Sequence, residues 1–489
     1  MSELAQRHST LGHGVDERRR GEHVTGVLLG ADLGTSGVKV VALDPSGAVL
    51  GEGESGYEVD RPRPGWAQTD PAVWRRALDD VLVQLAPALT GRRVAGLGLS
   101  GQMHGTVLVD DTGIPLGPAV LWPDSRAVAE VDRWRALPDA ARAALANPLV
   151  PGMTGPVLAW LAAHEPELLR RAAAVVLPKD VLRASLVPGA DPRVTDRSDA
   201  SATLLWDVVA DGWSSEATAA AGVDPGLLPR VRPSAEVVGT AALPVGEVPV
   251  VVGGADTPLA LLAAGTRTGR QVNLGTGAQV LRPGWTPAPA DDPPVHGYAD
   301  VEDRWYAMAA LQNGGLAWSW VCGVLGLTPV ELFDAAATVP TGAGGVVFRP
   351  FLTGERGGVA GPADRGGWTG LSASTTRAEL ARAAVEGVVF AVAAAADLLG
   401  GEGPVVLTGG GGRPAVVQQL LADVLAVPVR FLPIRSASAV GAALLAARGT
   451  GTEVATGQQP GRPVEPRPGP ELAAALDRWH AERALREPR

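Results

Sequence analysis

The feature that most constrains the fold is a strand–turn–strand pattern that occurs twice, far apart in the chain. Residues 26–43 form two apolar runs around the turn Gly-Thr-Ser-Gly at 34–37, and residues 271–280 repeat this with Gly-Thr-Gly at 275–277. Both predict β-hairpins with glycine-rich tips. Because a repeat spaced this widely is not a solenoid period, it predicts two similar α/β domains facing each other across one nucleotide.

Glycine-rich hairpins of this kind suit phosphate, because unhindered backbone N–H groups and hydroxyls can face an anion. A third glycine cluster, 409–412, follows the apolar strand 405–407 and precedes a helical pattern, which suits an adenine or an α-phosphate against bare backbone. Each turn alone has the alternative of an ordinary loop, but three together are harder to explain that way. The expected nucleotide contacts are Gly34, Thr35, Ser36, Lys39, Gly275, Thr276, Gly277, Gly410 and Gly411.

Two charged residues flank the first hairpin. Asp32 lies beside the predicted phosphate cradle, where a carboxylate can hold Mg²⁺, usually through water. Lysine occurs only at Lys39 and Lys179 in a chain that otherwise uses arginine. Lys39 is explained equally by a required small cation and by sequence drift, since lysine and arginine are not interchangeable at a phosphate site.

The segment 250–258 joins a short β-branched strand to a helical pattern through two glycines and Asp256. Ligands of α/β sheets bind at the carboxyl ends of strands, where an aspartate can take a proton from a substrate hydroxyl. Taken alone, however, the segment favours an aspartate that caps the following helix.

Another strand, 94–99, ends in the sequence Ser-Gly-Gln-Met-His-Gly. Gln102, Met103 and His104 are therefore candidate substrate contacts, although a histidine in such a place is ordinarily a satisfied core residue. Trp122 is a candidate for stacking on a sugar, with core filling as its alternative.

Composition excludes several classes of function. The formal net charge is -10, from 42 Lys+Arg and 52 Asp+Glu, which disfavours nucleic acid and anionic membranes as partners. The single cysteine excludes an intramolecular disulfide and a cysteine-based metal cluster, and a reducing cytoplasm is the expected compartment. Apolar runs such as 388–396 fall short of the roughly 18 residues of a membrane span.

Turn- and linker-forming residues along the chain predict that it divides into four parts. Residues 1–24 are polar and are expected to be a disordered extension; 25–248 form an N-terminal domain and 249–448 a C-terminal domain, with a linker and a terminal helix in 449–489.

Taken in order, the motifs resemble those of the FGGY family of carbohydrate kinases, and within it the xylulose kinases. The resemblance covers residues 26–448 and rests on DLGTSGVK (32–39), GQMHG (101–105), PKDxLR (178–183), SDAS (198–201), GGAD (253–256), LGTG (274–277) and GGGG (409–412). MHG and PKDxLR are the more specific pieces. The others mark the wider superfamily of sugar kinases, heat-shock ATPases and actin.

The resemblance implies two ribonuclease-H-like domains hinged around ATP and a sugar. It implies Asp256 as the catalytic base, and Gln102, Met103, His104 and Thr257 around the sugar. It implies Asp32 as the acid beside the metal and the γ-phosphate, with ATP and Mg²⁺ bound. The implied reaction is phosphorylation of a ketopentose, best D-xylulose giving the 5-phosphate.

Three departures from the family pattern leave the sugar open. They are Thr257 in place of the usual asparagine, Pro123 within Trp-Pro-Asp, and the loop Thr-Gly-Glu-Arg-Gly-Gly at 353–358. Ribulose, glycerol, gluconate or a polyol are alternative substrates. Alternatives of another class are an actin-like or chaperone-like ATPase and a sugar-sensing pseudokinase. The oligomeric state stays open, with a homodimer as one possibility.

Overall fold

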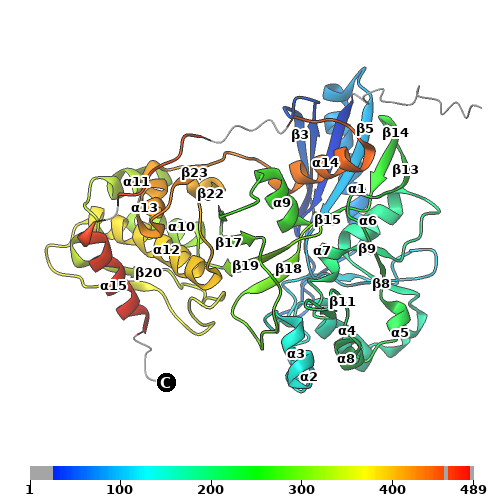
Figure 1. The fold of residues 1–489 in the computed structure, drawn as a ribbon, viewed down its shortest axis with the longest axis horizontal. Helices are drawn as coiled ribbons and strands as arrows, with labels where there is room; N and C mark the ends of the chain where they lie inside the picture. Colours follow the sequence, from blue (N-terminus) through cyan, green and yellow to red (C-terminus); the bar gives the residue numbers. More distant parts are fainter. Residues whose placement is uncertain (1–25, 456–460, 468, 485–489) are drawn as a thin grey trace, which may run out of the picture.

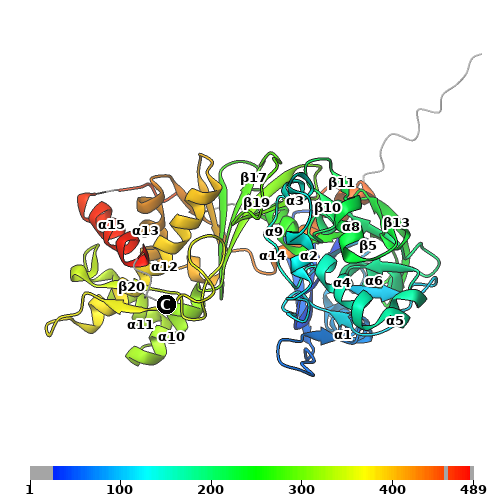
Figure 2. The ribbon, with the colours of Figure 1, turned by 90° about the horizontal axis from the view of Figure 1, so that it is seen from below.

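Two α/β lobes make up the computed structural model, which describes residues 26–455, 461–467 and 469–484 (Figures 1 and 2). The expected disordered extension at 1–24 lies outside the described residues.

The first lobe is built on a seven-stranded mixed sheet in the order β13-β14-β5-β1-β2-β3, with β15 also beside β5. β1 runs parallel to β5 and antiparallel to β2, as the predicted hairpin requires. The strands are β1 (Val27–Leu33), β2 (Gly37–Leu43), β3 (Val49–Gly56), β5 (Val94–Gly101), β13 (Val237–Leu243), β14 (Gly246–Val251) and β15 (Gly254–Ala255).

The second lobe is built on a six-stranded sheet in the order β18-β19-β17-β16-β22-β23. Its strands are β16 (Arg270–Leu274), β17 (Ala278–Pro283), β18 (His296–Ala299), β19 (Trp305–Leu311), β22 (Val405–Thr408) and β23 (Val429–Phe431). The series β19-β17-β16-β22-β23 repeats β3-β2-β1-β5-β14 in order and direction: two antiparallel pairs, then two parallel pairs. The repeated hairpins are therefore the first two strands of two copies of one sheet, and the fold is ribonuclease-H-like in both lobes.

A long insertion of short elements separates β5 from β13. It carries β6 (Val107–Val109), β7 (Ala119–Val120), α2 (Val131–Arg135), α3 (Asp139–Leu145), α4 (Thr154–His164), α5 (Pro166–Arg171), β8 (Ala174–Val176), α6 (Pro178–Leu186), β9 (Val194–Asp196), α7 (Arg197–Ala200), β10 (Trp206–Asp207), β11 (Gly212–Trp213), α8 (Ser215–Ala221), the 3₁₀ turn η2 (Pro225–Leu227) and β12 (Arg230–Arg232). Upstream of it, β4 (Gln68–Thr69) pairs with β7, and α1 (Ala72–Leu89) covers β2 and β3.

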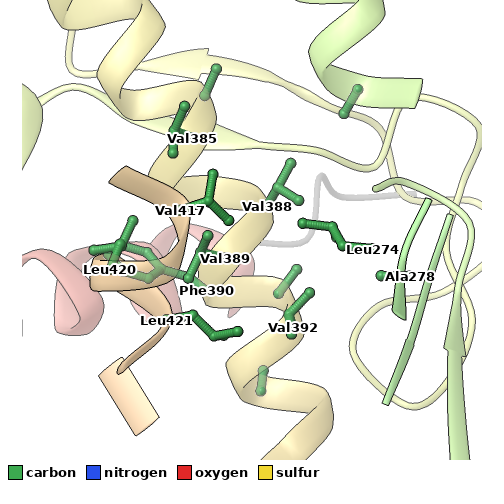
Figure 3. Packing of buried hydrophobic residues seen from close by; sticks show 14 of the residues in the cluster. Leu274, Ala278, Val385, Val388, Val389, Phe390, Val392, Val417, Leu420 and Leu421 are labelled. Carbon is green, nitrogen blue, oxygen red and sulfur yellow. The ribbon is translucent and has the colours of Figure 1, made fainter. Parts of the chain in front are cut away.

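The core of the second lobe is centred on α12 (Arg377–Leu399), a helix rich in buried alanine and valine. A reciprocal pair of hydrogen bonds between Thr376 and Glu379 begins this helix. Figure 3 shows its valines against α13 (Ala415–Leu425) and the β16–β17 hairpin. The other elements are α10 (Gly315–Leu325), α11 (Pro329–Ala337), η3 (Ala343–Gly345), β20 (Val347–Arg349), β21 (Gly367–Thr369), η4 (Gly410–Gly412) and α15 (Pro470–Ala484).

The chain returns to the first lobe near its end. The helix α14 (Ala437–Thr450) lies almost entirely within residues 249–448, the expected C-terminal domain. It nevertheless packs on β1, β2 and β5 of the first lobe, between the first sheet and α9 (Asp256–Ala264) (Figure 1). Glycines allow this: a Cβ at Gly98 would lie 1.8 Å from the carbonyl oxygen of Ala442, and one at Gly30 would lie 1.9 Å from that of Ala439. Residue 248, the expected domain boundary, lies inside β14 of the first sheet.

Among the described residues, no single helix has both the length and the apolarity to cross a bilayer. α10 and α11 together pass by length and composition, but they are bent by 90° at their junction.

Candidate active site

Three strand ends of the first sheet lie side by side and bring the two predicted acids together. On β1, Asp32 is opposite Ser100 of β5, and Ser100 is in turn opposite Gly254 of β15. Asp256 begins α9, one residue beyond β15. Because all three strands run parallel, Asp32 and Asp256 lie at the same carboxyl edge of the sheet, where ligands of such sheets bind.

The pKa values of both carboxyl groups are raised, and the charge of Asp32 contributes to the shift of Asp256. Burial, and then the charge of Asp32, raise the pKa of Asp256 to about 7. The pKa of Asp32 is also raised by burial, against a 2.7 Å hydrogen bond from the Ser100 hydroxyl and the charge of Lys39, which lower it. A carboxyl group whose pKa lies near neutrality can exchange protons readily at physiological pH, as a general base requires.

Asp256 is not the cap residue of α9, because Ala255 occupies the N-cap and Asp256 is the first helical residue. One oxygen, Oδ1, accepts from the backbone N–H of Thr257 at 2.6 Å and from its hydroxyl at 3.2 Å. The other, Oδ2, accepts no hydrogen bond from the described residues, and the side chain is half-buried. One face of the carboxylate is thus held while the other is left for a ligand.

Gln102, Met103 and His104 lie in residues 101–105, the motif GQMHG, which we call the sugar loop, whereas Thr257 follows Asp256. Gln102 is buried, and its side-chain N–H donates to the carbonyl of Gly34 at 3.1 Å, which ties this loop to the first phosphate hairpin. Its Oε1 has no hydrogen-bond partner in the described part of the chain. Met103 is buried in a hydrophobic cluster to which both lobes contribute, the second through residues of β17, β18 and β19. Thr257 is buried beside Asp256.

His104 is held in an unusual conformation. Its φ of 71° lies in the left-handed region, which non-glycine residues adopt rarely and at a cost of order 1–3 kcal/mol. Its Nδ1 donates to the carbonyl of Ala202 at 2.6 Å. Burial lowers the pKa of His104 to about 4, assisted by the charge of Arg356. The imidazole is therefore neutral at pH 7, with Nδ1 protonated and Nε2 free to accept a hydrogen bond.

The second lobe contributes a wall that the sequence analysis did not identify. His104 lies 5.8 Å from the ring of Tyr298 on β18, and the Tyr298 hydroxyl is 2.7 Å from Nδ1 of His296. Tyr306, on β19, is fully buried with a hydroxyl that has no partner among the described residues. Arg356, from the glycine-rich loop, lies 5.8 Å over the ring of Trp122 in the first lobe. One sequence signal could have indicated this wall: His296 and Tyr298 are two residues apart, a spacing that places both side chains on one face of a strand.

The predicted phosphate hairpins have closely similar tips. In each, the N–H of the first glycine donates across the turn: Gly34 to Gly37 at 2.9 Å, and Gly275 to Gly277 at 3.0 Å. Thr276 and Ser36 are exposed, and the hydroxyl of Thr35 accepts from the indole N–H of Trp122 at 2.9 Å. In η4, Gly410 faces open space, whereas a Cβ at Gly411 would lie 2.9 Å from Leu274. Bare backbone is thus available at all three turns.

Lys39 lies on the same side of the sheet as the acid beside the first hairpin. It is opposite Asp32 across β1–β2 and opposite Glu54 across β2–β3, and its Nζ is 3.6 Å from Glu54. Its role as a cation near the phosphates stays a prediction.

The donor set fits Mg²⁺ bound together with a nucleotide. The described residues contain no group of three or more His, Cys, Asp or Glu side chains that could form a metal cage. Mg²⁺ bound with a nucleotide needs only one or two carboxylates beside water and phosphate oxygens. Asp32, with one oxygen held by Ser100, meets that requirement.

Asp124, the acid of the Trp-Pro-Asp segment, is engaged in other interactions. It is buried, pairs with Arg126 at 2.8 Å and accepts from the backbone N–H of Ala67 at 2.6 Å.

A cavity of about 820 Å³ lies at the C-terminal ends of α9 and α14, away from the two acids.

Comparison with known proteins agrees with this geometry. Residues 27–263 match the N-terminal domain, and residues 271–450 the C-terminal domain, of the FGGY family of carbohydrate kinases. The chain is 34% identical over 439 residues to the xylulose kinase of Escherichia coli, covering 86% of this chain and 89% of that one. It is also 34% identical over 471 residues to the xylulose kinase of Streptomyces rubiginosus, covering 92% of each. The crystal structure of a xylulose kinase from Rhodospirillum rubrum superposes with a TM-score of 0.82 at 28% identity, over 93% of this chain and 97% of that one. The chain therefore belongs to the FGGY family of carbohydrate kinases.

Proposed function

We propose that the chain transfers the γ-phosphate of ATP to the primary hydroxyl of D-xylulose, giving D-xylulose 5-phosphate and ADP, with Asp256 as the general base. The observation that carries this proposal is the half-buried Asp256, with a pKa of about 7, beside Asp32 at the carboxyl edge of the sheet. The choice of D-xylulose is supported by the xylulose kinases among its relatives.

In the proposed reaction Asp256 takes the proton of the sugar hydroxyl as its oxygen attacks the γ-phosphorus. The new bond joins this oxygen to phosphorus, the bond from phosphorus to the β,γ-bridging oxygen breaks, and ADP leaves with that electron pair. Phosphoryl transfer asks the protein mainly for positioning and charge stabilisation. Mg²⁺, held by Asp32 with the nucleotide, would supply neutralisation of phosphate charge. The three glycine turns would hold the nucleotide between the lobes.

His104 is proposed to accept a hydrogen bond from a sugar hydroxyl at Nε2. His104→Ala should weaken sugar binding by roughly 1–3 kcal/mol, because the sugar loses one buried partner, and should leave ATP affinity unchanged. Calorimetric titration with D-xylulose measures the change. His164→Ala is the control, since His164 only stacks on Trp160 and bonds its carbonyl. Unchanged sugar affinity in His104→Ala would return this residue to a structural role.

The proposed base predicts a pH dependence of activity. Because Asp256 accepts a proton only when ionised, and burial raises its pKa to about 7, kcat/KM should rise with pH through about 7 and level off above it. The profile should be measured at constant ionic strength and constant free Mg²⁺. A profile that is flat down to pH 5 would contradict the assignment.

A panel of substrates tests the sugar. Initial rates of ADP formation should be compared for D-xylulose, ribulose, glycerol, gluconate and a pentitol, and in the absence of any sugar. We expect the highest kcat/KM with D-xylulose. Thr257 and Pro123 are where a different preference would originate. Sugar-independent ATP hydrolysis would favour an actin-like or chaperone-like ATPase, and binding without turnover would favour a sugar sensor.

We also propose a cytoplasmic location. The single cysteine, Cys322, is a buried free thiol, which suits a reducing compartment.

A further inference from the structure

The backbone that leads to Asp256 is not held by a continuous strand. Gly253 adopts a φ of 90° and separates β14 from β15, a strand of only two residues. Besides the pairing of β15 with β5, four residues of other segments bond this stretch. The N–H of Val252 donates to the carbonyl of Glu236 at 2.9 Å. Arg183 donates to the carbonyl of Val252 at 3.1 Å, the N–H of Gly253 donates to the carbonyl of Ser234 at 3.0 Å, and the N–H of Ala255 donates to the Ser198 hydroxyl at 2.9 Å. Of the bonds that side chains of other segments make to this stretch, the Ser198 bond is the nearest to Asp256.

The Ser198 hydroxyl is itself fixed. It accepts from Ala255 and donates its own proton to Oδ2 of Asp196 at 2.5 Å. That carboxylate oxygen also accepts from the backbone N–H of Ser198 at 3.0 Å and from the hydroxyl of Ser234 at 2.9 Å. Ser198 and Asp196 are both fully buried, so water does not compete for these bonds.

Asp196 belongs to a buried group of five charged side chains, which we name the Lys179 cluster: Lys179, Asp180, Arg183, Asp196 and Asp199. The ammonium of Lys179 lies 2.7, 3.1 and 2.9 Å from Asp180, Asp196 and Asp199. The sugar loop rests on the same residue, since a Cβ at Gly101 would lie 2.8 Å from the Cβ of Lys179. The cluster therefore supports both the sugar loop and the turn that carries Asp256.

We propose that Ser198, oriented by Asp196, is a positioning residue for phosphoryl transfer: it fixes the amide of Ala255 and thereby the place of the Asp256 carboxylate relative to the sugar loop. This inference rests on the proposed role of Asp256 as base. An error of about 1 Å in the place of a reacting group can cost about 10²-fold in rate, so a bond this close to the base affects turnover more than binding.

Two serines that share Asp196 give a matched test. Ser198→Ala and Ser234→Ala each remove one hydroxyl bond from Oδ2 of Asp196, but only Ser198→Ala removes the acceptor of the Ala255 amide. We expect Ser198→Ala to lower kcat about 10- to 100-fold with a smaller change in the KM for D-xylulose, and Ser234→Ala to stay within about twofold of the parent. Ser198→Cys, which keeps the volume with a weaker acceptor, should fall between them and serves if Ser198→Ala folds poorly. Equal kcat in Ser198→Ala and Ser234→Ala would overturn the inference.

Combining variants separates this inference from the role of Asp256. If Ser198 acts through Asp256, adding Ser198→Ala to Asp256→Asn should lower kcat little further, because two residues that act as a unit are not additive. A full further loss in the double variant would overturn the positioning role. If Asp256→Asn alone keeps near-normal kcat, the base assignment fails. If Asp256→Asn is slow and Ser198→Ala behaves as Ser234→Ala, only the positioning inference fails.

Discussion

Asp256→Asn is expected to lower kcat by ~10²–10⁴ while sugar and ATP affinities change little. The amide keeps the shape of the side chain and can still accept from the Thr257 N–H, but it cannot usefully take a proton from the attacking hydroxyl. Steady-state kinetics with D-xylulose gives kcat, and calorimetry gives the two affinities. Near-normal kcat with a lower melting temperature would make Asp256 a structural residue of α9.

The same substitution should change stability in the opposite direction from activity. Burial and the charge of Asp32 raise the folded-state pKa of Asp256 to about 7, above the ordinary value of an aspartate. The folded state therefore favours the protonated carboxyl, and the stability associated with it is lost as pH rises towards 7. Asp256→Asn should accordingly melt higher than the parent at pH 8 and show a smaller difference at pH 5. A lower melting temperature at pH 8 would contradict this reading of the site.

Lys179→Met is expected to destabilise the fold by about 3–5 kcal/mol, because removing one partner of a buried ion cluster leaves uncompensated charge. Burial by itself would lower the pKa of Lys179, but Asp180, Asp199 and Asp196 outweigh it and raise that pKa. Without the ammonium, three buried carboxylates would face Arg183 alone. Urea unfolding at pH 7.5 measures the loss.

The only other lysine provides the control. Lys39 carries an exposed side chain that pairs with an exposed Glu54 at 3.6 Å, and surface pairs of this kind contribute about 0–1 kcal/mol. Lys39→Met should therefore unfold within about 1 kcal/mol of the parent. Equal stability of Lys179→Met and Lys39→Met would show that the Lys179 cluster does not hold the fold together.

The sheets could be predicted from the sequence because their signals are local. Apolar runs interrupted by glycine turns gave β1, β2, β16, β17 and β22, and the repeated hairpin indicated two similar lobes. The place of α14 could not be predicted this way. Its helical pattern is clear, but its packing on the first sheet depends on Gly30 and Gly98 meeting its backbone, and periodicity does not encode which distant surface a helix will contact.

The residues of the candidate site also divide into those with a local sequence signal and those without one. Asp32, His104 and Asp256 could be proposed from the sequence because each lies at or just beyond the carboxyl end of a strand, where ligands of α/β sheets bind. His296, Tyr298 and Arg356 were missed because they approach His104 from the second lobe, a relation between distant segments. Lys179 stood out as a rare residue and as part of PKDxLR (178–183), but its burial among three carboxylates depends on tertiary structure.

The central claim is tested most directly by identifying the phosphorylated product. The parent protein, D-xylulose and Mg-ATP should be followed by phosphorus NMR, with the same mixture lacking sugar as control. The account predicts one sugar ester, phosphorylated at the primary hydroxyl of carbon 5, formed in equal amount with ADP and absent from the control. Inorganic phosphate in place of a sugar ester would contradict it.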